Sequence, residues 1–222
     1  HNYDGSGSAG ISRGIQASDF IISLGSWDNQ VGTKKQQAAD FMHELGHNLG
    51  LRHGGNDNVN YKHNFLSIMN YFFSMDWLRY DGKAQRLDYS RLDINDLDEN
   101  ALSEKKGLDQ VGGDTTIKKY GTLFYDITGT LRLDDQSYKD VDWDGNATVS
   151  LSDVAVDINN DTVKSVLKGH CEEWKKIVYD GGAVGVGGGV GMKAVIKNPP
   201  PTCPEFTYEK YLWLKESTVE TE

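Results

Sequence analysis

The sequence predicts an α+β fold: a small twisted sheet with one amphipathic helix, followed by an irregular C-terminal subdomain with helices. The apolar run at residues 20–24, closed by Gly25, includes β-branched residues and is typical of a strand. After Thr33 the apolar residues recur at spacings of three and four, which is the period of a helix. From residue 54 onward aromatic residues are scattered without a long regular pattern.

The first helix has clear boundary signals, and we expect it at residues 34–49. Thr33 and Gln36 match a capping box, and Gly50 occupies the position of a left-handed helix stop. The other elements are shorter, and we expect them at residues 9–15 (extended), 96–106 (helix), 115–133 (extended), 162–179 (helix, with Asp161 as N-cap) and 208–215 (helix).

The composition narrows the function classes. Among 222 residues, 33 are acidic and 23 basic, a formal net charge of −10. Nucleic-acid binding needs clustered basic residues, so a nucleic-acid partner is not expected, and no apolar run approaches the roughly 20 residues of a membrane span. Cys171 and Cys203 allow one intramolecular pairing; a disulfide is favoured, and two buried thiols remain the alternative.

The stretch HELGHNLGLRH at residues 43–53 contains a candidate metal-binding motif. His43 and His47 lie one helical turn apart, so both imidazoles leave the same helix face and can share one metal ion. Gly50 then lets the chain turn back, which brings His53 to the same ion. Three neutral nitrogens leave zinc an open fourth position, as in catalytic sites, and Glu44 can reach a metal-bound water as a base.

This pattern, HExxHxxGxxH, resembles the signature of the metzincin zinc endopeptidases, which pair it with a downstream Met-turn. The segment SIMNY at residues 67–71 is similar to that turn. The resemblance implies that Met69 forms an apolar floor beneath the zinc and that Tyr71 assists the transition state. Within the clan the chain looks most like secreted bacterial or archaeal pappalysin-like proteins.

The resemblance implies an extracellular endopeptidase that acts on proteins or peptides. Zinc-bound water would attack the scissile carbonyl while Glu44 takes its proton and returns it to the leaving amine. We expect a catalytic domain at 1–180, with an N-terminal subdomain at 1–53 and a C-terminal one at 54–180, and a Gly/Pro-rich linker and tail at 181–222. Only 33 residues precede the helix, so we expect either that upstream strands are missing from this chain or that the N-terminal subdomain is unusually small.

A second segment, within residues 140–161, places oxygen-bearing side chains at alternate positions, which suits Ca²⁺. It resembles an EF-hand or dockerin-type loop, although Ala147 stands where glycine is usual and Asp153 replaces a glutamate. A solvated acidic turn is the alternative. The candidate calcium ligands are Asp142, Asp144, Asn146, Thr148 and Asp153, with Asp157, Asn159 and Asp161 available to the same ion.

Two other functions stay open from the sequence. One is a secreted, calcium-stabilised adhesion or scaffold module that keeps the zinc site without turnover. The other is a zinc hydrolase that acts on a non-protein amide. Asn70, Phe72 and Phe73 are candidates for a substrate pocket or for the core. The pairs Asp98-Glu99 and Glu172-Glu173 are expected on solvated helix faces, and His63 and His170 at the surface or in packing.

Overall fold

The computed structural model describes residues 7–75, 78–84, 86–108, 115–177 and 206–220. It is a mixed α+β structure with small sheets and two α-helices, α1 (Lys34–Asn48) and α2 (Tyr208–Ser217), so the predicted α+β class is confirmed. Neither helix of this described part is long and apolar enough to cross a membrane.

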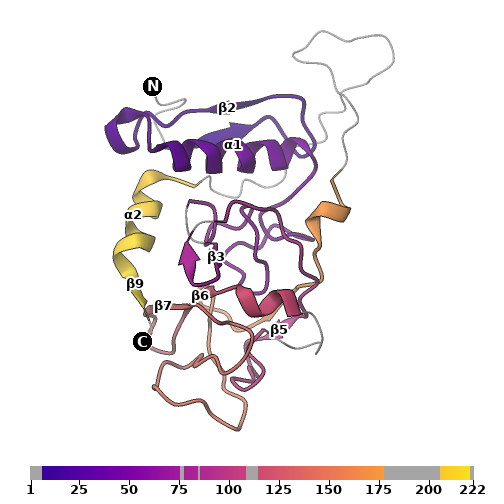
Figure 1. Cartoon of the computed structure of the whole chain (residues 1–222), viewed down its shortest axis with the longest axis vertical. Helices are drawn as coiled ribbons and strands as arrows, with labels where there is room; N and C mark the ends of the chain where they lie inside the picture. The colour runs from indigo at the N-terminus through magenta and orange to yellow at the C-terminus, as the bar shows by residue number, and fades with distance from the viewer. Residues whose placement is uncertain (1–6, 76–77, 85, 109–114, 178–205, 221–222) are drawn as a thin grey trace.

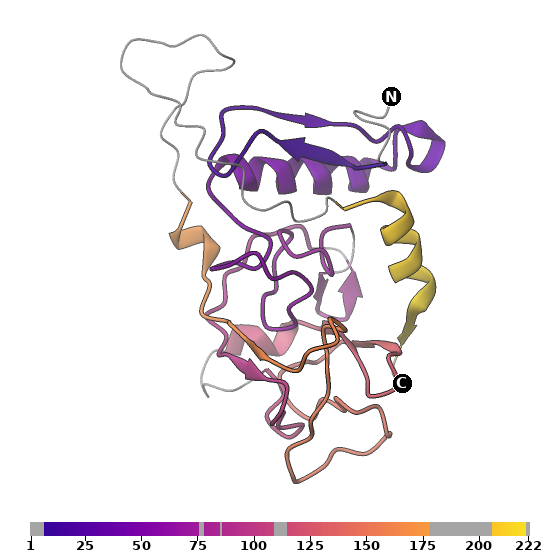
Figure 2. The ribbon, with the colours of Figure 1, turned by 180° about the vertical axis from the view of Figure 1, so that it is seen from behind.

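The N-terminal part of the chain forms a strand pair that lies along α1 (Figures 1 and 2). Strand β1 (Gly10–Ser12) pairs antiparallel with β2 (Phe20–Ile22), with Ile11 opposite Ile21. The predicted capping box is present: Thr33 Oγ1 accepts from the Gln36 amide at 3.2 Å, and Gln36 Oε1 accepts from the Thr33 amide at 2.7 Å. This box fixes the start of the helix that carries the histidine motif.

The remainder is built from short strands and long irregular connections. Strands β3 (Arg79–Tyr80) and β4 (Lys83–Ala84) form a hairpin, and β5 (Leu97–Asp98) pairs with β8 (Val166–Leu167). A three-stranded sheet joins β6 (Thr122–Tyr125), β7 (Leu131–Asp134) and β9 (Thr218–Glu220), with β7 and β9 parallel. Single 3₁₀ turns lie at Asp28–Gln30, Thr115–Lys119 and Glu173–Lys175.

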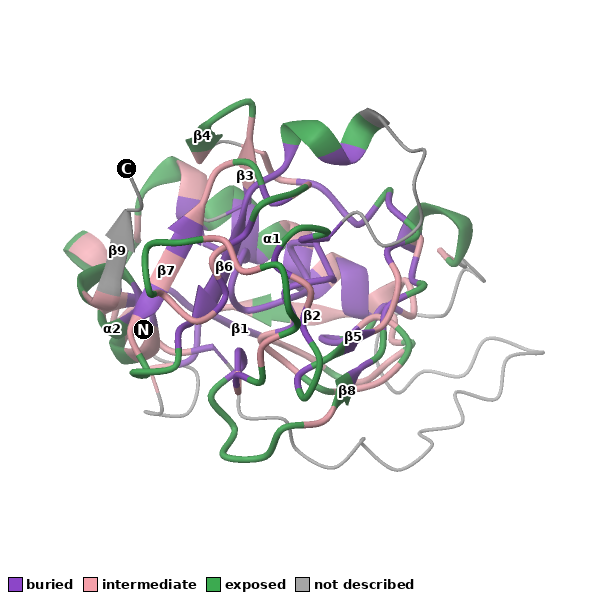
Figure 3. Ribbon diagram, turned by 90° about the horizontal axis from the view of Figure 1, so that it is seen from below, coloured by how far each residue is buried: buried purple, intermediate pink, exposed green. Residues whose placement is uncertain are grey.

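The core includes buried residues of α1, β6 and β7, such as Ala39, Phe124 and Leu133, and Figure 3 colours the buried residues purple. Phe72 and Phe73 are fully buried in this core, and the side-chain Nδ2 of Asn70 donates to the Phe65 carbonyl at 3.0 Å. These three candidates for a substrate pocket therefore belong to the core packing.

Two predicted helices are wrong. Residues 96–106 hold strand β5 and turns, and the described part of 162–179 holds strand β8 and a 3₁₀ turn. The helical spacing of apolar residues at 162–179 is not a buried stripe, because Val163, Val166 and Trp174 are 60%, 44% and 45% exposed. Residues 178–179 lie outside the described part.

The last helix confirms the prediction of a short helix near residues 208–215. In both ribbon views α2 runs along the side of the molecule, from the level of α1 to the sheet that contains β7 (Figures 1 and 2). Cys171 is buried and its thiol is free, so the described residues show no disulfide; its predicted partner Cys203 lies outside them.

Candidate metal centre

Three imidazoles converge on one point beneath α1. The Nε2 atoms of His47 and His53 lie 3.0 Å apart, those of His43 and His47 3.1 Å apart, and those of His53 and His43 3.2 Å apart. Two nitrogens that bind one tetrahedral zinc ion at roughly 2.05 Å are about 3.3 Å from each other. The residues present therefore fit a metal ion, and this buried group could bind one.

Local backbone structure explains the convergence. Gly50 has φ of +91°, and the Leu51 amide donates back to the Gly46 carbonyl at 2.9 Å, which ends the helix and turns the chain toward His53. Lys62, 1% exposed, donates to the Gly54 carbonyl at 3.0 Å and so holds the loop just after His53. Lys62 had no signal in the sequence, because its contacts depend on the folded loop.

The second nitrogen of two imidazoles is held by a backbone carbonyl. His43 Nδ1 lies 2.9 Å from the Ile68 oxygen, and His47 Nδ1 lies 2.9 Å from the Leu51 oxygen. A carbonyl only accepts, so both Nδ1 atoms carry the proton and both Nε2 atoms present a lone pair. Lone pairs that face one another at this distance repel, and a shared cation turns that repulsion into attraction.

The burial of the three imidazoles favours their neutral form. Desolvation lowers the pKa of His43 to about 3, with a further contribution from the charge of His47, and lowers the pKa of His47 to about 4. The pKa of His53 is also lowered, first by burial and then by His43 and His47. Neutral imidazole is the form that ligates a metal.

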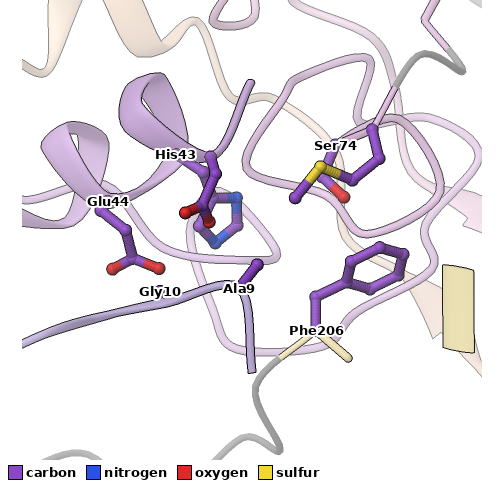
Figure 4. A pocket seen from close by; sticks show the side chains of 8 residues that line it. Ala9, Gly10, His43, Glu44, Ser74 and Phe206 are labelled. Carbon is purple, nitrogen blue, oxygen red and sulfur yellow. The ribbon is translucent and has the colours of Figure 1, made fainter. Parts of the chain in front are cut away.

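A small pocket opens beside the histidines, and Glu44 lines it (Figure 4). Glu44 is 1% exposed and follows His43 on α1, so its carboxylate reaches the pocket from a different direction than the imidazoles. Strand β1 runs directly alongside: a Cβ on Gly10 would lie 2.7 Å from Glu44 Cγ. Asp40, one turn earlier on α1, also lines the pocket and was missed by the sequence analysis.

The predicted Met-turn lies against the imidazoles. Met69 is fully buried, and Tyr71 places its ring 4.5 Å from that of His53 and 5.6 Å from that of His43, measured between centroids. The turn is fixed by Ser67, whose Oγ accepts from the Met69 amide at 3.0 Å and donates to a carboxylate oxygen of Glu173. The structure thus brings together five of the predicted site residues, His43, His47, His53, Met69 and Tyr71.

Glu173 was expected on a solvated face, and that expectation is wrong. It is fully buried behind the Met-turn, where its carboxylate also accepts from the Ser90 amide at 2.7 Å. Burial raises the pKa of Glu173 to about 7, although its bonds with Ser67 and Ser90 lower it. His63 is fully buried and His170 is exposed, as packing and surface residues would be.

The acidic segment forms a tight loop at residues 142–150. The Asn146 amide donates to Asp142 Oδ1 and to Asp144 Oδ1, both at 3.1 Å, and the Ala147 amide donates to Asp142 Oδ2 at 2.8 Å. Glu104 closes the loop by accepting from the Ser150 amide at 2.6 Å. Asp142 and Asp144 lie with Glu104 in a group that could bind a metal ion.

The segment at residues 157–165 repeats this loop 15 positions later. The Asp161 amide donates to Asp157 Oδ1 at 3.2 Å and to Asn159 Oδ1 at 3.1 Å, and the Thr162 amide donates to Asp157 Oδ2 at 2.8 Å. Glu99 closes this loop by accepting from the Ser165 amide at 2.8 Å. Asp161 therefore belongs to a loop and does not cap a helix.

The two loops also share their strained positions and their buried glutamates. Ala147 and Thr162, both at the sixth position of their loop, have φ of +67° and +75°. Glu104 and Glu99 are both fully buried, which contradicts the expectation that Glu99 lies on a solvated helix. The spacing of residues within each loop does not point to these glutamates, because each is separated from its loop by about 40 or more residues. Asp153 is exposed and outside the group that could bind a metal.

No protein-family model, curated protein or solved structure matches the chain.

Proposed function

We propose that this protein is a zinc-dependent endopeptidase with a metzincin-like catalytic unit. The observation that carries the proposal is the convergence of three Nε2 atoms within 3.0–3.2 Å, beside a pocket that Glu44 lines. His43, His47 and His53 would hold the metal. When bound, zinc polarises a carbonyl and lowers the pKa of water toward about 7, which suits hydrolysis.

The residues around the metal would share the work of peptide hydrolysis. Glu44 accepts a proton from the attacking water and passes it to the amide nitrogen as the C–N bond breaks. Tyr71, whose ring lies against His43 and His53, donates a hydrogen bond to the oxyanion. Ile68 and Leu51 keep His43 and His47 in the tautomer that ligates the metal.

The decisive test separates metal binding from turnover. We expect the zinc-loaded chain to cleave a quenched-fluorescent peptide library, and Glu44→Gln to keep one zinc per chain and lose at least about 10³-fold in rate. Glu172→Gln, a change away from the site, is the matched control and should retain the rate. Zinc binding without cleavage by any variant would favour the scaffold function, and cleavage of simple amides alone would favour a non-protein substrate.

We propose further that the two acidic loops each bind one calcium ion. Asp142, Asp144 and Asn146 would ligate one ion with Glu104, and Thr148 lies in the same loop. Asp157, Asn159 and Asp161 would ligate a second ion with Glu99. Oxygen ligands at alternate positions suit Ca²⁺, and within the described residues no lysine or arginine forms an ion pair with either buried glutamate.

Calcium titration tests this second proposal. We expect two calcium ions per chain in zinc-saturated protein, with Glu104→Gln and Glu99→Gln each removing one. Lys105→Ala, whose side chain pairs with exposed Asp140 at 2.8 Å, is the control and should leave both. A single ion that needs both glutamates would restore the one-site interpretation of the sequence. We place the protein outside the cell, where millimolar calcium fills sites of modest affinity.

A further inference from the structure

Residues 206–208, near the C-terminus, pair with residues 7–9, which lead into strand β1 beside the metal centre. The Ala9 amide donates to the Phe206 carbonyl at 3.2 Å, and the Tyr208 amide donates to the Gly7 carbonyl at 3.4 Å. Ser8 and Thr207 face each other between these bonds in an antiparallel bridge. Residues 206–208 therefore pair with residues 7–9, which lead into β1, through one isolated antiparallel bridge.

The side chain of Phe206 lines the same pocket as Glu44 and His43, and forms the wall on the side away from Glu44 (Figure 4). Phe206 is 5% exposed, and its ring centroid lies 5.0 Å from that of Tyr71, which itself contacts His53. The Phe206 ring therefore contacts Tyr71, and the ring of Tyr71 in turn contacts the imidazole of His53. The backbone of Phe206 is held in the extended form that a peptide adopts when it adds to a sheet edge.

Helix α2 anchors this paired segment. Tyr208 donates from its hydroxyl to Asp28 Oδ1 at 2.6 Å, and the rings of Tyr208 and Tyr211 pack on Trp27 at 5.2 and 5.3 Å between centroids. Farther along, Trp213 lies 5.9 Å from Tyr125 of β6. The helix therefore connects the part that contains α1 with the part that contains β6, along one side of the molecule (Figure 1).

We propose that residues 206–208 act as an internal competitor for an extended peptide at residues 7–9, with Phe206 in the place of a large apolar side chain of that peptide, against Tyr71. The proposal rests on the proposed peptidase function. Because this competitor is covalently attached, a peptide binds only to the fraction of molecules in which residues 206–208 have left residues 7–9. Weakening its pairing raises that fraction and tightens the apparent binding.

The experiment measures peptide binding without turnover, in zinc-loaded Glu44→Gln protein. The probe is a fluorescein-labelled hexapeptide copy of residues 206–211, followed by anisotropy. We expect Phe206→Ala to tighten the dissociation constant by about tenfold or more. Tyr208→Pro should act the same way, because proline fits the first residue of α2 but removes the amide that donates to Gly7. Glu209→Ala, an exposed change on the same helix, is the control.

The outcomes separate this inference from the peptidase proposal. Unchanged or weaker binding in both Phe206→Ala and Tyr208→Pro would overturn it and make residues 206–208 a fixed part of the fold. Equal binding of a hexapeptide copy with alanine in place of the phenylalanine would overturn the role of the apolar side chain. Tighter binding in a protein that cleaves no peptide with Glu44 intact would support peptide docking at residues 7–9 while the peptidase proposal fails.

Discussion

Met69 lies directly against Gly46 of α1, so closely that a Cβ on Gly46 would be 2.3 Å from Met69 Sδ. The same Cβ would also lie 3.0 Å from Cε1 of Tyr89, whose hydroxyl donates to the Met42 carbonyl at 2.6 Å. The helix that carries His43 and His47 thus rests on the Met-turn through a position without a side chain. This contact sets the distance between the helix and the loop that supports it.

Substitution of Gly46 by alanine should therefore destabilise the protein. The added methyl group cannot enter without moving Met69 or the helix, and overpacking of this kind costs about 1–3 kcal/mol. We expect a lower melting temperature together with weaker zinc binding, because helix and turn separate. Ala38→Gly, earlier on the same helix, is the control for backbone effects: it should lower stability by about 1 kcal/mol and leave zinc affinity unchanged. A Gly46→Ala protein with unaltered zinc affinity would contradict this role.

The buried carboxyl of Glu173 should make stability depend on pH. Its pKa rises from 4.5 to about 7 in the folded protein, so between these values the native state holds a proton that the unfolded chain has lost. The stabilisation is complete below pH 4.5 and is lost as pH rises toward 7, by about 3 kcal/mol at most. Denaturant unfolding of wild type and Glu173→Gln from pH 5 to 8 measures this loss.

The Gln variant cannot ionise, so we expect its free energy of unfolding to vary less over this range than that of the wild type. Glu172→Gln, next in the chain and paired with Lys175 at 2.6 Å, is the control and should keep the wild-type dependence. Parallel pH profiles for wild type and Glu173→Gln would show that the buried carboxyl does not titrate in this range.

Glycine at the positive-φ position of each acidic loop should stabilise the protein. Ala147 and Thr162 hold positive φ, which costs an L-residue roughly 1–2 kcal/mol relative to glycine. We expect Ala147→Gly and Thr162→Gly each to stabilise the calcium-loaded protein by about 1 kcal/mol, measured as a rise in melting temperature. Ala155→Gly, between the two loops, is the comparison and should not raise the melting temperature. Destabilisation by both loop variants would mean that these backbone conformations are not those of the protein in solution.

The sequence could predict the histidine site because its geometry is local. A helix places His43 and His47 on one face, and Gly50 returns the chain to His53 within a few residues, so spacing alone determines the site. The capping box of Thr33 and Gln36 is local for the same reason. No such rule connects Glu104 or Glu99 with the acidic loops that they close, because those contacts form only when distant segments pack together.

The wrong helices have a related cause. At residues 157–165 the loop carboxylates accept the amide hydrogens that a helix would use within its own backbone, and this competition overrides the apolar spacing of the segment. The position of Phe206 had no local signal either, since it contacts Ala9, Trp27 and Tyr71, which are all distant from it in the sequence. The spacing of residues predicts the structure of a single element, whereas contacts between distant elements depend on how the whole chain packs.

Zinc content in calcium-saturated protein tests the central claim most directly. After dialysis against excess calcium, we predict one zinc ion per chain by mass spectrometry, and an affinity at least about 100-fold weaker in His43→Ala, His47→Ala and His53→Ala. Exposed His170→Ala is the control and should bind zinc like the wild type. Wild-type protein without stoichiometric zinc, or a His53→Ala variant that binds it equally well, would contradict the account.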